Sequence, residues 1–147
     1  MVKKKLYEKC IELLNLQIDK YKKEMEMIKE ALEGENSQSD DDDGGKGELL
    51  NEIEKNARYL DNTEKLKSQL SKIDIFQEHD SVTNGSLVET ENNFFFITIA
   101  LGKLDLGDKK NYYSISTDAP IYEHLKGKKT GDSFSFNNMN YKILSVN

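Results

Sequence analysis

The chain has 147 residues, of which 33% are charged and 36% hydrophobic, and its mean hydropathy is −0.74. This length allows one ordinary domain or two small elements, and the apolar fraction is too low for one large core. We therefore expect an elongated part beside a compact part. The 21 basic and 27 acidic residues give a net charge of −6, which argues against direct capture of nucleic acid through its phosphates. A binding role then has to act through protein or metal.

The N-terminal residues and the cysteine content indicate a reduced, intracellular protein. The basic start runs directly into charged residues, without the apolar segment that a signal peptide needs. The longest apolar run, residues 94–101, is far shorter than the roughly 20 residues that span a bilayer. Cys10 is the only cysteine and cannot form an internal disulfide. We expect a cytoplasmic protein with no membrane contact.

Two long amphipathic helices are predicted in the first half of the chain. In the first, apolar side chains follow alternating steps of four and three residues, and a second apolar stripe widens this face near its start. The second helix has a similar pattern with one extra three-residue step, which predicts local overwinding. The main stripe of the first helix comprises Tyr7, Ile11, Leu14, Ile18, Tyr21, Met25, Ile28 and Leu32, its second stripe Leu6, Cys10, Leu13 and Leu16, and the stripe of the second helix Ile53, Ala57, Leu60, Thr63, Leu66, Leu70 and Ile73.

An acidic, glycine-rich segment, residues 34–47, joins the two helices. It carries five acids and one base, and three of its last four residues are glycine, so it is predicted to be a loop. Because the two helices offer equal numbers of apolar layers, we predict an intramolecular antiparallel hairpin over residues 1–74, with this loop at its tip, in a monomeric protein. The alternative is a parallel dimeric coiled coil, which would place the loop in the middle of a rod.

Residues 75–147 have the pattern of a small sheet domain. Pro120 is predicted to open a short helix, residues 121–126, that Gly127 ends. Ten of the thirteen Phe and Tyr residues, beginning with Phe76, lie in this range and predict an aromatic core. With an antiparallel sheet and one short helix, the whole chain is α+β in class. The strand-like runs are residues 86–90, 93–101, 111–116, 133–137 and 140–146.

Four consecutive carboxylates in the loop, Asp40, Asp41, Asp42 and Asp43, form the strongest chemical signal. They repel one another unless solvent, a cation or a basic surface offsets the repulsion. Their open spacing suits a hydrated hard cation such as magnesium, whereas the residue order does not fit an EF-hand. The alternative is a solvated acidic linker. Their position at the far end of a stiff rod favours a role as a probe.

Short motifs follow one another in a specific order in the C-terminal part. They are Tyr113-Ser-Ile-Ser116, Ala119-Pro-Ile121, His124-Leu-Lys-Gly-Lys128, Thr130-Gly-Asp132, Phe134-Ser-Phe136 and Tyr141-Lys-Ile-Leu144. Together with an N-terminal hairpin that carries acids at its tip, this succession resembles the Gre transcript-cleavage factors of bacterial RNA polymerase over nearly the whole chain. The resemblance implies an FKBP-like C-terminal domain that docks at the rim of the polymerase secondary channel, while the hairpin reaches the active centre. The docking residues that it implies are Asp118, Ala119, Pro120, Ile121 and Leu125.

The chain departs from the family pattern at two places. Ala119 stands where the family has a turn serine. The family's tip stretch is split here between residues 47–49 and 56–59, so that its acidic residue corresponds to Glu48 on one alignment and to Glu52 on the other. Four successive Asp residues look more like the acid-rich tips of Gre relatives that inhibit the polymerase than like those of the cleavage factors.

These observations predict a transcription elongation regulator that is not itself an enzyme and has no cofactor of its own. Its tip acids, Asp40 to Asp43 with Glu48 and Glu52, would help hold the magnesium of the polymerase active site, which either stimulates transcript cleavage or inhibits synthesis. The predicted partner is RNA polymerase, without sequence-specific binding to nucleic acid. The alternative is a coiled-coil protein adaptor with an FKBP-like binding domain and a passive acidic linker. A prolyl isomerase of the FKBP type is a third possibility.

Overall fold

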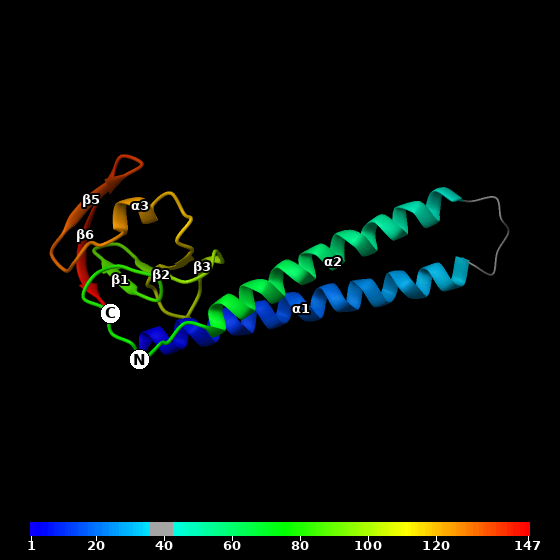
Figure 1. The fold of residues 1–147 in the computed structure, drawn as a ribbon, viewed down its shortest axis with the longest axis horizontal. Helices are drawn as coiled ribbons and strands as arrows, with labels where there is room; N and C mark the ends of the chain where they lie inside the picture. Colours follow the sequence, from blue (N-terminus) through cyan, green and yellow to red (C-terminus); the bar gives the residue numbers. More distant parts are fainter. Residues whose placement is uncertain (36–42) are drawn as a thin grey trace. The chain divides into compact units, whose positions relative to one another are not determined.

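The computed structural model describes the backbone of residues 1–35 and 43–147 and the side chains of residues 1–34 and 45–147. Two long helices are followed by strands and one short helix (Figure 1). The chain forms two compact units, one made of Met1–Ile11 with Ser68–Asn147 and the other of Glu12–Lys67. The predicted boundary after residue 74 lies inside the first unit. Within the described residues, no helix combines the length and the apolar character needed to cross a membrane.

Helices α1 (Val2–Glu35) and α2 (Asp43–Ser71) run antiparallel beside each other, which confirms the predicted helical hairpin (Figure 1). The rings of Tyr21 and Tyr59 meet across the two helices with their centroids 5.5 Å apart. All eight residues of the main α1 stripe are buried or half-buried. The second stripe ends earlier than predicted, because Leu16 is 58% exposed.

The apolar stripe of α2 differs from the prediction at one position. Asn56 is buried and Ala57 is exposed, so the stripe passes through Asn56 in place of Ala57, while the extra short step between Thr63 and Leu66 remains. Burial of Asn56 is tolerated because its side-chain amide donates to the Glu52 carbonyl at 3.0 Å. The hydroxyl of buried Thr63 likewise donates to the Tyr59 carbonyl, at 2.8 Å.

The predicted loop, residues 34–47, is too long at both ends. Helix α1 continues to Glu35, and α2 begins at Asp43 and includes three glycines. Glycine disfavours a helix by about 1 kcal/mol, but tertiary packing decides most helix boundaries. Here the inward pattern extends through half-buried Lys46 and Leu49. Asp40 to Asp42 and the side chain of Asp43 lie outside the described residues.

The second half of the chain forms a six-stranded sheet in the order β3-β4-β2-β1-β6-β5. The sheet is mixed and not purely antiparallel as predicted, because β2 pairs with β4 in parallel. The predicted strand over residues 93–101 is shorter in the structure, because β2 ends at Ile97. A strand that was not predicted, β3, begins at Gly102, with φ +73°. Strand β3 pairs with the side of β4 that faces away from β2, so β4 lies between β3 and β2. The strands are β1 (Leu87–Thr90), β2 (Phe94–Ile97), β3 (Gly102–Leu104), β4 (Tyr112–Ile115), β5 (Ser133–Phe136) and β6 (Met139–Val146).

Both faces of the sheet are covered within this unit. On one face, α3 (Tyr122–Leu125) packs on an apolar cluster from β1, β2, β5 and β6. On the other, the first turns of α1 bury Leu6 and Cys10, and the Cys10 thiol hydrogen-bonds to Ser114 of β4. This burial agrees with the second apolar stripe predicted near the start of the first helix, to which Leu6 and Cys10 belong. Phe76, however, is 74% exposed and does not belong to the predicted aromatic core.

Cys10 is expected to react very slowly with Ellman's reagent in the folded protein. Burial raises the pKa of the Cys10 thiol to about 11, from an ordinary value of 9.0, so about 100-fold less thiolate is present at pH 7.5. Absorbance at 412 nm should therefore rise at least about 100-fold more slowly in buffer than in 6 M guanidinium chloride. Equal rates in the two solutions would contradict the burial of this side chain.

Candidate partner-binding surfaces

A tight turn precedes α3 and positions the predicted docking residues. The amide of Asp118 donates to the Ser116 hydroxyl at 3.2 Å, and the amide of Ala119 donates to the Ser116 carbonyl at 3.1 Å. Pro120 then starts the helical turns, as predicted, and Gly127 ends them with φ +75°. These bonds are local, so the turn is held by its own backbone.

The structure divides the five predicted docking residues into an exposed pair and an anchored group. Asp118 and Pro120 are exposed, whereas Ala119 and Ile121 are half-buried and pack against the core cluster. Leu125 is 0% exposed and lies inside that cluster, so its predicted place on the docking face is wrong. The apolar spacing of Ile121 and Leu125 reflects attachment of the helix to the sheet. A partner at this surface would meet Asp118 and Pro120.

The exposed side of α3 also carries an aromatic contact. The ring of His124 lies 5.5 Å from the ring of Phe136 on β5, and His124 itself is exposed. Glu123, the preceding residue, is exposed as well. Around this turn, the domain therefore presents the carboxylates of Asp118 and Glu123 and the imidazole of His124 to solvent.

Of the predicted tip acids, the structure describes the side chains of Glu48 and Glu52. Both are exposed and lie one helical turn apart on α2. No group of three His, Cys, Asp or Glu side chains that could hold a metal ion occurs among the residues whose placement is described. The predicted metal ligands Asp40 to Asp43 fall outside that part of the chain. Glu48 and Glu52 can thus offer two carboxylates to an ion that another molecule also binds.

The structure has a further site that the sequence did not predict. It includes Lys3, which the sequence shows only as one of several basic residues at the start of the chain. Lys3 is 4% exposed and, with Phe76, lines a cavity of about 460 Å³. One signal was available, because Lys3 lies three and seven residues before the buried Leu6 and Cys10, on the same helix face. Nothing in the sequence distinguishes the exposed Phe76 from the aromatic residues of the core.

No family model matches the sequence, and no curated protein matches it. Among solved structures, the chain is similar to GreA factor homolog 1 (Gfh1) of Thermus thermophilus, with 19% identity, coverage of 96% of this chain and 94% of that chain, and a TM-score of 0.35. Another structure of the transcription factor Gfh1 gives 19% identity, coverage of 95% and 92%, and a TM-score of 0.35. Gfh1 of Thermus aquaticus gives 20% identity, coverage of 95% and 94%, and a TM-score of 0.33.

Proposed function

We propose that this protein is a transcription elongation regulator that binds bacterial RNA polymerase through its sheet domain and directs the acids of its hairpin turn to the polymerase active centre. The observation that carries the proposal is the ordered motif series from Tyr113 to Leu144, combined with a preceding helical hairpin. Within that series, Asp118 and Pro120 are exposed on a packed domain, as a docking element requires.

The chemistry assigned to the hairpin needs ligands from two molecules. In a two-metal site, the second magnesium ion activates a water and stabilises the displacement. The carboxylates that would reach such an ion are Asp40 to Asp43, Glu48 and Glu52, and the polymerase supplies the other ligands. A productive geometry would stimulate transcript cleavage, and a non-productive one would inhibit synthesis. The protein acts as an accessory factor in either mode.

Replacing Asp118 with Lys is expected to weaken binding to RNA polymerase core enzyme by at least about tenfold, because a charge reversal at the centre of an interface costs several kcal/mol. The side chain is exposed and only its amide is hydrogen-bonded, so the fold should persist. Fluorescence anisotropy of a labelled protein measures the dissociation constant. Ile121→Asp is a poorer test, because half-buried Ile121 packs against the core.

Glu91→Lys is the matched control for this experiment, since Glu91 is an exposed acid elsewhere on the same domain. Its binding should equal that of the parent within about twofold. An Asp118→Lys protein that binds as tightly as Glu91→Lys would remove the docking assignment. A parent protein that does not bind the polymerase at all would favour the adaptor function instead.

A further inference from the structure

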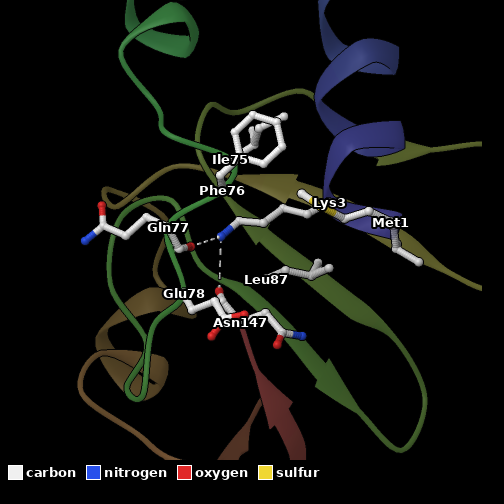
Figure 2. Close-up of a pocket in the computed structure, with 9 residues that line it drawn as sticks. Met1, Lys3, Ile75, Phe76, Gln77, Glu78, Leu87 and Asn147 are labelled. Carbon is white, nitrogen blue, oxygen red and sulfur yellow. Dashed lines mark hydrogen bonds between the residues drawn. The ribbon is translucent and has the colours of Figure 1, made fainter.

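A cavity of about 460 Å³ lies within the unit formed by Met1–Ile11 and Ser68–Asn147, where the start of α1, the segment after α2 and the first residue of β1 meet. Its volume falls in the range of sites that bind a ligand or a partner side chain. The walls combine five apolar residues with four polar ones (Figure 2). The apolar residues are Met1, Val2, Ile75, Phe76 and Leu87, and the polar ones are Lys3, Gln77, Glu78 and Asn147.

Two large apolar side chains of this cavity lie in solvent. Phe76 is 74% exposed and Met1 is 61% exposed. Phe76 is held in place by its backbone, because its amide donates to the Asp74 carboxylate at 3.0 Å in a local turn. An exposed aromatic ring on a hydrogen-bonded backbone turn, beside an apolar cavity, is typical of an interaction surface.

The charges around the cavity favour a cationic partner. The Lys3 ammonium group is buried and donates to the Gln77 carbonyl at 2.9 Å and to the Asn147 carbonyl at 3.3 Å (Figure 2). Burial lowers the pKa of Lys3, while the nearby carboxylates of Asp74 and Glu78 act in the opposite direction. These two carboxylates are exposed, and of the two ammonium groups, those of Lys3 and of the Met1 N-terminus, that of Lys3 is buried. Burial and the charge of Lys3 also lower the pKa of His79, which leaves its imidazole neutral at pH 7. The rim therefore exposes two carboxylates against one ammonium group, which is a net negative charge.

We propose that this cavity binds a segment of a protein partner in which an aromatic side chain is followed by a basic residue. The aromatic ring would pack on Phe76 and Leu87 inside the cavity, and the basic side chain would lie against the Glu78 and Asp74 carboxylates. The surface shares no residue with the turn from Asp118 to Pro120. The proposal is consequently independent of polymerase binding and would survive the failure of the proposed function.

The test uses the dipeptide acetyl-Phe-Arg-amide as a probe in ¹H–¹⁵N NMR titrations of the full chain. We expect saturable shifts with a dissociation constant on the order of 1 mM, centred on the amides of Lys3, Gln77, Glu78 and Leu87. The matched probe acetyl-Phe-Glu-amide should bind about fivefold more weakly, because its carboxylate faces the acidic rim. Loss of one rim charge in Glu78→Gln should reduce this preference at least about twofold.

Two variants control for the fold and for charge. Phe76→Ala removes a side chain that is mostly in solvent, so its spectrum should remain that of the folded protein while binding of both probes is lost. Glu123→Gln removes an exposed acid of α3 and should leave the preference unchanged. Equal binding of the two probes, or shifts centred elsewhere, would overturn the proposal. Shifts at the cavity that depend on protein concentration without any probe would also overturn it, because a second copy of the chain would then be the occupant.

Discussion

Leu125→Ala is expected to lower the free energy of unfolding of the sheet domain by about 2–5 kcal/mol, the cost of removing a fully buried leucine and leaving a cavity. Leu125 is 0% exposed and lies with Tyr122 in the cluster that joins α3 to the sheet. Urea denaturation followed by tyrosine fluorescence measures the change. Tyr112, Tyr122 and Tyr141 lie buried in this domain, but Tyr21 and Tyr59 belong to the hairpin, so this signal reports on both parts. The transition of the sheet domain is therefore identified from the amide resonances of β1, β2 and β6 in ¹H–¹⁵N spectra across the same urea series.

Leu144→Ala provides the matched control, because the same atoms are removed from a side chain that is 44% exposed on β6. Its effect should stay below about 1 kcal/mol. A loss below about 1 kcal/mol for Leu125→Ala as well would contradict the packing of α3. The comparison also separates two roles of the helix, since a residue that anchors α3 changes stability, whereas a residue that contacts the partner changes affinity in a protein of unchanged stability.

The antiparallel pairing of the two long helices was predictable because apolar residues recur with a helical period along both of them. Eight apolar positions in α1 agree on one helix face, so no single residue decides the outcome. The turn that joins β5 to β6 has a purely local cause. Asn137 and Asn138 have φ angles of 50° and 62°, which Asn tolerates better than most residues, and they join β5 to β6.

The features that were not predictable depend on partners distant in sequence. The parallel pairing of Phe94 with Tyr112 requires β3 to lie outside β4, and no local pattern encodes that order. Asn56 faces inward because its helix offers the Glu52 carbonyl as a partner, although Ala57 fits an apolar pattern better. Phe76 stays in solvent because an Asp74 turn, and not a core contact, fixes its backbone.

Replacing Asp40, Asp41, Asp42 and Asp43 together with Asn is expected to abolish the effect of the protein on transcript cleavage or elongation while leaving its affinity for RNA polymerase within about threefold of the parent. This prediction rests on the proposed function, in which the sheet domain docks and the acids act on the metal. Asn keeps the size of the side chain but removes the charge that a hydrated magnesium ion requires. Transcription by assembled elongation complexes gives the activity, and anisotropy gives the affinity.

The control removes the same number of charges from the exposed sides of the helices, in a protein with Glu8→Gln, Asp19→Asn, Asp61→Asn and Glu64→Gln. This variant should act as the parent does, because its carboxylates lie away from the hairpin turn and general electrostatic steering is weak at physiological salt. Glu48→Gln combined with Glu52→Gln tests the two described acids, and an intermediate loss of activity would assign them a supporting role. If the four-Asn protein still altered cleavage or elongation as the parent does, the acidic segment would be a passive linker. If it lost polymerase binding altogether, the acids would serve as an anchor for the complex, and the metal-directed mechanism would be wrong.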